Sequence, residues 1–234
     1  MSPGTRIGLL GGTLDPIHLG HVDAALAART ALGLNRVIVL PSRVPPHRPQ
    51  QPSASPYHRF AMTALAVNGV EGLEASDIEL SAPGPSYTAD TLARFQQCSG
   101  LSPSQIFFIT GADAFAEIET WHRYPDVLDL SHFVVVSRPG FPAATVRHRL
   151  PLLAPRMTDS ADAPFPAIFL VDAPTRDVSS TEIRRRRRAG EPLTGLVAAS
   201  VEQHIVQHGL YVDDTAPTSI STSSRRADHL HGQD

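Results

Sequence analysis

A glycine-rich stretch near the start of the chain, Gly11 to His21, separates an apolar run from a run of strong helix formers. The apolar run is Ile7 to Leu10, and Val22 to Arg29 favours a helix. The predicted order is therefore strand, glycine turn, helix. Adjacent glycines let a ligand approach the backbone closely, and the start of a helix offers unpaired N–H groups at the positive end of its dipole. This arrangement predicts an anion site.

Two histidines in this stretch lie three residues apart, at His18 and His21. With a helix that begins near Pro16, both side chains share one face and point into the anion site. Their ring nitrogens can donate hydrogen bonds to phosphate oxygens.

Apolar runs and helical patterns alternate along most of the sequence. The predicted strands are Ile7–Leu10, Arg36–Leu40, Leu73–Leu80, Gln105–Thr110, Phe133–Val136 and Ile168–Val171. The predicted helices, besides the first, are Tyr57–Val67, one that opens at Ser86, one from Ser179 through Arg188, and Val197–His208. A proline- and alanine-rich insert over 141–167 is assigned no element, and the polar residues 213–234 are predicted to be a disordered tail.

Strand and helix alternation of this kind predicts an α/β fold, a Rossmann-like doubly wound parallel sheet with helices on both faces, formed by residues 1–212. Ligands of such sheets bind at the carboxyl ends of the strands. Each chemically suggestive segment follows a predicted strand, so all are expected at one rim. These segments are Gly11–His21, Pro41–Arg48, Gly111–Asp113, Arg138 and Asp172–Thr181.

Composition narrows the kind of ligand. The net charge of −3 argues against a dedicated nucleic-acid binder, and no apolar segment is long enough to span a membrane. The chain has no lysine, so every cationic contact to a phosphate must come from arginine or histidine. A single cysteine, Cys98, excludes an internal disulfide. Without a secretory leader pattern, a cytoplasmic location is expected.

The pattern Gly-Gly-Thr-x-Asp-Pro-x-His-x-Gly-His resembles the signature of the nucleotidyltransferase superfamily of adenylyl- and cytidylyltransferases. Leu14 stands where that family usually has phenylalanine. A second segment, Val178 to Arg184, resembles the superfamily's Ile-Ser-Ser-Thr-x-Ile-Arg motif, whose hydroxyls, amides and arginine hold the triphosphate. Only Arg184 of the five consecutive arginines matches that motif, and Arg185 to Arg188 are expected on a solvated face.

Further segments resemble those of bacterial nicotinate-mononucleotide adenylyltransferases. They are Pro45-Pro46-His47-Arg48, the Ser-Tyr-Thr sequence that begins at Ser86, and Gly111-Ala112-Asp113 followed by Trp121-His122. The resemblance implies transfer of AMP from ATP to nicotinic acid mononucleotide, giving deamido-NAD and pyrophosphate in NAD synthesis, with Mg²⁺ bound to ATP. Read from the residues alone, Trp121 is equally compatible with core packing.

The resemblance also implies roles for individual residues. The expected catalytic residues are His18, His21 and Arg184. Expected ATP contacts are Gly11, Gly12, Thr13, His18, Gly20, His21, Arg48, Gly111, Asp113, Ser179, Ser180, Thr181 and Arg184. Expected mononucleotide contacts are Asp15, His47, Tyr87, Thr88, Trp121 and Arg138. For Arg138, a phosphate contact and a cap on the preceding strand both remain open.

Several alternatives accompany this interpretation. The acceptor can be nicotinamide mononucleotide or phosphopantetheine. From other classes, the chain can be a metal-binding protein that uses His18, His21 and a third ligand such as His47, or a non-catalytic nucleotide-binding regulator. The sequence leaves the oligomeric state open, homo-oligomers included.

Overall fold

The strands of the computed structural model, which describes residues 4–46, 51–160 and 162–212, form one parallel sheet of order β3-β2-β1-β4-β5-β6. The strands are β1 Ile7–Gly12, β2 Arg36–Pro41, β3 Leu73–Ala75, β4 Ile106–Gly111, β5 His132–Val136 and β6 Ile168–Val171. Neighbouring strands are in register, so that Leu9 lies beside Ile38 on one side and beside Phe108 on the other. The predicted doubly wound fold is confirmed.

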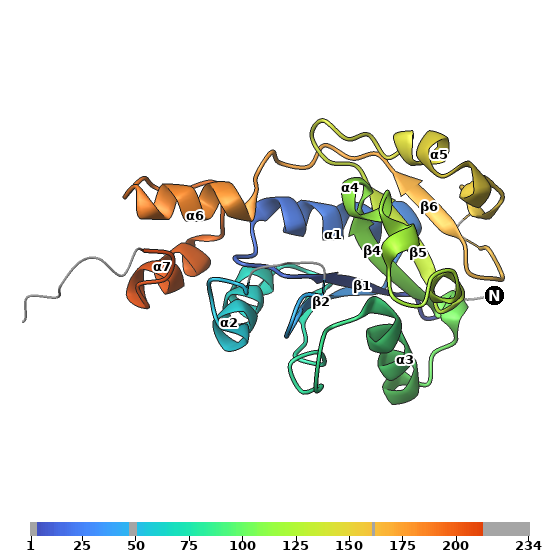
Figure 1. Cartoon of the computed structure of the whole chain (residues 1–234), viewed down its shortest axis with the longest axis horizontal. Coiled ribbons are helices and arrows are strands. Elements are labelled where there is room, and N and C mark those ends of the chain that lie inside the picture. Colours follow the sequence, from blue (N-terminus) through green and yellow to red (C-terminus); the bar gives the residue numbers. More distant parts are fainter. Residues whose placement is uncertain (1–3, 47–50, 161, 213–234) are drawn as a thin grey trace, which may run out of the picture.

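Helices cover both faces of this sheet (Figure 1). They are α1 Leu19–Leu32, α2 Pro56–Val67, α3 Thr88–Ser99, α4 Ala112–Phe115, α5 Thr145–Arg149, α6 Ser180–Arg188 and α7 Ala199–Gln207, with 3-10 turns at Pro103–Gln105, Ile118–Thr120, Asp126–Asp129 and Pro151–Arg156. In Figure 1, α6 and α7 lie together at one end of the molecule, and β6 lies with α5 at the other. None of the helices in the described ranges is long and apolar enough to cross a membrane.

Successive strand residues contribute to two different cores, because side chains alternate across a sheet. Val37 and Val39 of β2 join the core beneath α1, α2 and α7, whereas Ile38 and Leu40 join the core beneath α3. All of these side chains are buried, as the continuous apolar run predicts for a strand covered on both faces.

Two predicted elements were wrong in extent. The first helix begins at Leu19 instead of near Pro16, because His18 has an extended backbone, with φ −142° and ψ 170°, and serves as the N-cap residue. β3 ends at Ala75 instead of continuing to Leu80, because the chain turns at Asp77, whose carbonyl accepts the N–H of Leu80. The alternation of apolar and polar residues in this segment therefore comes from side chains that are buried in a turn, and not from a strand.

The remaining boundaries differ less. The helix predicted to open at Ser86 starts at Thr88, and the last helix covers Ala199–Gln207. The 141–167 insert contains α5 and the 3-10 turn at Pro151–Arg156. The predicted disordered tail, 213–234, lies outside the described residues.

Candidate active site

Loops from the carboxyl ends of the strands surround two adjoining cavities, of about 680 and 330 Å³. Both cavities are lined by Gly11 and Gly12 at the end of β1, by Thr13 directly after it, and by Thr110 of β4. The larger cavity extends toward α6, and the smaller one toward the start of α3. The predicted convergence of the motifs at one rim is therefore observed for the segments that the structure describes.

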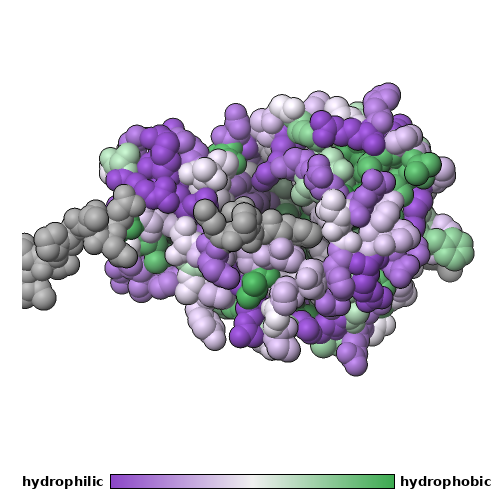
Figure 2. All heavy atoms as spheres, in the orientation of Figure 1, coloured by the Kyte–Doolittle hydropathy of each residue, from purple (hydrophilic) through white to green (hydrophobic). Residues whose placement is uncertain are grey.

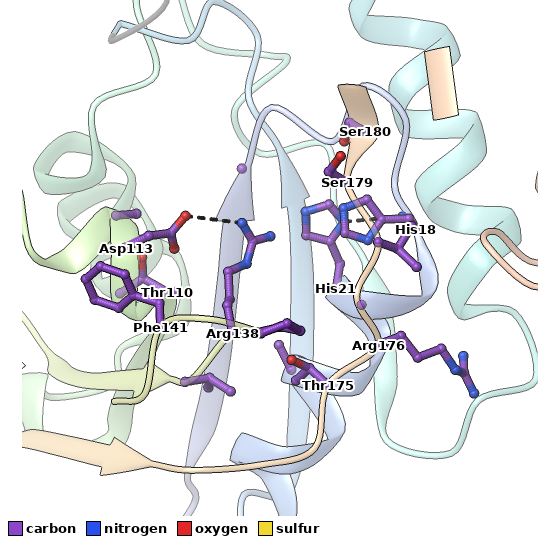
Figure 3. Close-up of a pocket in the computed structure, with 18 of the residues that line it drawn as sticks. His18, His21, Thr110, Asp113, Arg138, Phe141, Thr175, Arg176, Ser179 and Ser180 are labelled. Carbon is purple, nitrogen blue, oxygen red and sulfur yellow. Dashed lines mark hydrogen bonds and ion pairs between the residues drawn. The ribbon is translucent and has the colours of Figure 1, made fainter. Parts of the chain in front are cut away.

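The histidine pair lies on the wall of the larger cavity (Figure 3). The rings of His18 and His21 stack with centroids 3.6 Å apart, and the backbone N–H of His18 donates to Nδ1 of His21 at 3.2 Å. Because Nδ1 of His21 accepts this hydrogen bond, a neutral His21 ring carries its proton on Nε2. The pair thus presents an N–H donor without a positive charge.

Close packing explains why the residue between the two histidines, Gly20, is a glycine. A Cβ at this position would lie 3.1 Å from the carbonyl oxygen of Arg176 and 3.2 Å from Nδ1 of His18. A larger residue would therefore push apart the helix start and the loop that precedes α6. Gly20 also lines the larger cavity.

Burial keeps both histidines neutral. It lowers the pKa of His18 to about 3 and that of His21 well below the ordinary value, and in each case the nearby positive charge of Arg138 adds to the effect. For His21 the His18 ring contributes as well. At neutral pH the wall of the larger cavity therefore holds two uncharged imidazoles.

We expect the ring signals of His18 and His21 to remain those of the neutral form when the pH falls from about 8 to about 5 in an NMR titration of the folded protein. Unfolded histidine has a pKa near 6.5, so the unfolded chain binds protons first. Stability from the neutral pair is thus fully present above about 6.5 and is lost as the pH falls toward about 3.

The His18→Ala and His21→Ala proteins assign the signals, and the urea-denatured wild-type protein is the control, in which the same rings should titrate near the ordinary value of about 6.5. A midpoint near 6.5 in the folded protein would contradict the prediction.

The start of α6 forms the wall of the larger cavity beside the histidine pair (Figure 3). Ser179, Ser180 and Thr181 all line it. Oγ of Ser179 caps the helix by accepting the N–H of Glu182 at 3.1 Å, and Oγ of Ser180 donates to the carbonyl oxygen of Pro16 at 2.9 Å. Hydroxyls and free amides at a helix N-terminus favour a bound anion.

Arg184 and Arg185 of α6 are engaged with other groups of the protein. Arg184 is not among the cavity-lining residues; its guanidinium donates to the carbonyl oxygen of Asp15 at 2.6 Å and to Oγ1 of Thr181 at 3.3 Å. Arg185 pairs with Glu182 and Glu191 on the surface, and Figure 2 shows this end of the molecule as strongly hydrophilic. In this structure Arg184 supports the turn before His18.

Asp113 and Arg138 form an ion pair of 3.3 Å at the edge of the larger cavity, between the ends of β4 and β5 (Figure 3). Arg138 lies on the side of the histidines, and it is not among the residues that line the smaller cavity with Trp121. Gly111 allows the aspartate to turn back, because a Cβ there would come within 2.5 Å of Oδ1 of Asp113. The expected grouping of Arg138 with the mononucleotide is not what this geometry favours.

The smaller cavity has an aromatic wall. Trp121 meets Phe108 edge to face, with ring centroids 6.1 Å apart, and Tyr87 stacks on His122 at 4.2 Å. Thr88, the first residue of α3, also lines the cavity. Tyr87, Thr88 and Trp121 are thus brought together from two distant segments. Trp121 is half-buried and combines core contacts with a place on the cavity wall.

Glu79 is a cavity residue that sequence reasoning missed. Its side chain is 6% exposed, lines the smaller cavity and accepts a hydrogen bond from Oγ1 of Thr91 at 2.8 Å. Burial raises the pKa of this carboxyl. Its position in an apparently alternating strand pattern gave no sign that it would face a cavity.

Arg59 is a second residue that the sequence did not reveal. Its side chain is fully buried within α2. The guanidinium donates to the carbonyl oxygens of Thr13, Ser42, Arg43 and Ala54. These carbonyls belong to the loops after β1 and β2 and to the segment before α2, so one buried cation joins the loops around both cavities.

One expected mononucleotide contact, Asp15, lies outside both cavities. Asp15 is 2% exposed, is not among the residues lining either cavity, and directs its carboxylate to the N–H groups of Ser53 and Ala54 at 2.7 and 3.0 Å. Its role in this structure is to hold loops together. His47 and Arg48 lie outside the described residues.

Comparison with known proteins places this site in a family. The Cytidylyltransferase-like family model matches residues 9–186. The chain is 41% identical to a probable nicotinate-nucleotide adenylyltransferase of Desulfitobacterium hafniense, over 90% of this chain and 97% of that protein. It is 39% identical to a probable nicotinate-nucleotide adenylyltransferase of Desulfatibacillum aliphaticivorans, over 88% of this chain and 100% of that protein.

A solved structure has the same fold. Nicotinic acid mononucleotide adenylyltransferase of Plasmodium falciparum, complexed with NaAD, superposes with a TM-score of 0.69 at 17% identity, covering 88% of this chain and 97% of that one. The same protein complexed with APC gives a TM-score of 0.67 at equal identity and coverage.

Proposed function

The chain belongs to the cytidylyltransferase-like family and, within it, to the nicotinate-nucleotide adenylyltransferases, and from this premise we propose how its two cavities divide the reaction. The enzyme transfers AMP from ATP to nicotinic acid mononucleotide and releases pyrophosphate, with deamido-NAD as the other product. This membership decides against the metal-binding and the non-catalytic alternatives. The observation that carries the proposal is that two cavities of different chemistry meet at the end of β1, where both are lined by Gly11, Gly12 and Thr13.

The larger cavity takes ATP. Its walls combine the N–H donors of the histidine pair with the hydroxyls and amides at the start of α6, which suit a triphosphate. Gly11 and Gly12, which lack side chains, would let the α-phosphate approach the backbone at the end of β1 closely. Asp113, at the far edge, is placed to accept hydrogen bonds from ribose hydroxyls once Arg138 turns toward the phosphates.

The smaller cavity takes the mononucleotide. Trp121 and Phe108 give it an apolar aromatic wall that suits a pyridine ring. The N-terminus of α3 at Thr88 offers free amides and a hydroxyl, which favour the carboxylate of a nicotinate ring. The acceptor phosphate would then lie toward Gly11, Gly12 and Thr13, which line both cavities.

The transfer is an in-line substitution at phosphorus. An oxygen of the mononucleotide phosphate attacks the α-phosphorus, a new P–O bond forms, and the bond to the bridging oxygen breaks with its electron pair leaving on pyrophosphate. The phosphate is already anionic, so no protein nucleophile is required, and positioning with charge stabilisation supplies the catalysis. Neutral N–H donors of His18 and His21 stabilise the charge that develops on the α-phosphate and the leaving group.

Mg²⁺ fits this site as a companion of ATP. Among the described residues, no group of three or more His, Cys, Asp or Glu side chains is arranged to hold a metal ion. Mg²⁺ commonly keeps several waters and is held through substrate phosphates and one or two carboxylates. Among the described residues, Asp113 and Asp177 are the carboxylates that line the larger cavity, and the metal would supply charge neutralisation on the β- and γ-phosphates.

Pyrophosphate release tests the proposal. The purified protein should release pyrophosphate from ATP with nicotinic acid mononucleotide, more slowly with nicotinamide mononucleotide and not with phosphopantetheine, and mass spectrometry should identify deamido-NAD. Replacing Mg²⁺ with a chelator should stop turnover. A protein that binds ATP yet converts neither mononucleotide would overturn the assignment.

A further inference from the structure

The turn between β1 and α1 is conformationally disfavoured. Leu14 has a φ of 49°, in the left-handed region that residues with a Cβ rarely adopt. A residue persists there only where surrounding contacts hold it. This turn leads directly to His18, the N-cap of α1, so its conformation sets the position of the histidine pair.

Side chains from distant parts of the chain hold the turn on both sides of Leu14. Arg59 of α2 donates to the carbonyl oxygen of Thr13 at 2.7 Å, and Arg184 of α6 donates to that of Asp15 at 2.6 Å. The Asp15 carboxylate accepts N–H groups from the segment before α2. The turn is therefore fixed by tertiary contacts, since its own sequence disfavours it.

A further contact to this turn comes from the segment after α7. Tyr211 is 7% exposed, and its hydroxyl donates to Oδ1 of Asp15 at 2.9 Å in a buried hydrogen bond. Burial, and then the neighbouring Asp15 carboxylate, raise the pKa of this phenol, so the hydroxyl keeps its proton. Tyr211 is not among the residues lining either cavity, so this hydroxyl acts on the reaction only through Asp15.

We propose that Tyr211 is a positioning residue for adenylyl transfer, whose hydroxyl fixes Asp15 and thereby the turn that orients His18 and His21. The segment after α7 thus holds the active-site turn in place, through a hydrogen bond between residues that lie 196 positions apart in the sequence. The proposal rests on the proposed function for its kinetic consequence, and on the geometry alone for its effect on the histidines.

The first experiment removes only the hydroxyl. Tyr211→Phe should lower kcat about 10-fold while KM for ATP and for the mononucleotide changes less than about 2-fold, because a small displacement of reacting groups costs rate more than binding. Tyr57→Phe is the matched control, since Tyr57 is 79% exposed on α2. A kcat equal to that of the control, or a loss of activity fully explained by a smaller folded fraction, overturns the proposal.

A double-mutant cycle tests the route through Asp15. Asp15→Asn removes the carboxylate. The double variant, Asp15→Asn with Tyr211→Phe, should have nearly the same kcat as Asp15→Asn alone, because the two changes break one interaction. Effects on kcat that multiply independently would contradict the proposal.

NMR separates this inference from the function itself. The ring signals of His18 and His21 should shift in Tyr211→Phe and stay in place in Tyr57→Phe, whichever substrate the enzyme uses. Should the wild-type protein show no turnover while these signals shift, the proposed function fails and the positioning contact stands. Unmoved signals in Tyr211→Phe overturn the positioning role.

Discussion

Replacing His18 with alanine should lower kcat by about 100-fold or more while KM for ATP changes only a few-fold. The buried ring of His18 stacks on His21 beside the cavity assigned to the triphosphate. Its contribution is strongest when charge develops on the α-phosphate and the leaving pyrophosphate, and an interaction of that kind raises kcat more than it lowers KM. Initial rates of pyrophosphate release over a range of ATP concentrations measure both constants.

Two further variants test whether the loss in His18→Ala is specific to this site and to its N–H donor. His148→Ala, on the exposed surface of α5, should keep wild-type kcat. His18→Gln retains a neutral N–H donor of similar reach and should recover part of the loss, because the pKa of His18, lowered to about 3, makes the native donor neutral too. Wild-type kcat in His18→Ala, or a change in KM alone, would remove the catalytic role.

Arg59→Met should destabilise the protein by about 3 kcal/mol. The substitution keeps most of the apolar stem but leaves the carbonyl oxygens of Thr13, Ser42 and Ala54 buried without this donor. Unsatisfied buried acceptors are costly because they have lost water as well as their partner. Urea denaturation followed by circular dichroism measures the free energy of unfolding.

Arg147→Met on α5 is the control for the loss of a surface arginine, and it should change the free energy of unfolding by less than about 0.5 kcal/mol. Equal stability of the two variants would show that Arg59 does not join the loops energetically. In the fraction of Arg59→Met that folds, turnover should also fall, because the loops after β1 and β2 both line the cavities.

Much of the fold is predictable because its signals are local. A continuous apolar run such as Arg36–Leu40 indicates a strand buried on both faces, and Ser179 signals a helix start by its capping chemistry. The predicted strand to Leu80 was wrong because alternation reports burial, and Glu79 is buried in a turn instead of a sheet. The helix start near Pro16 was wrong because His18 is extended and serves as the N-cap residue, so the helix begins at Leu19.

By itself, the sequence determined the parallel α/β fold, the glycines and histidines that follow the first apolar run, and the described segments that meet at the rim. Those features depend on residue type and spacing within short segments. Only the tertiary structure decided that His18 and His21 are neutral, that Asp15 and Arg184 hold the turn, and that Arg59 and Tyr211 reach it from elsewhere. Desolvation and hydrogen bonds between residues far apart in the chain exist only once it has folded, so no local pattern records them.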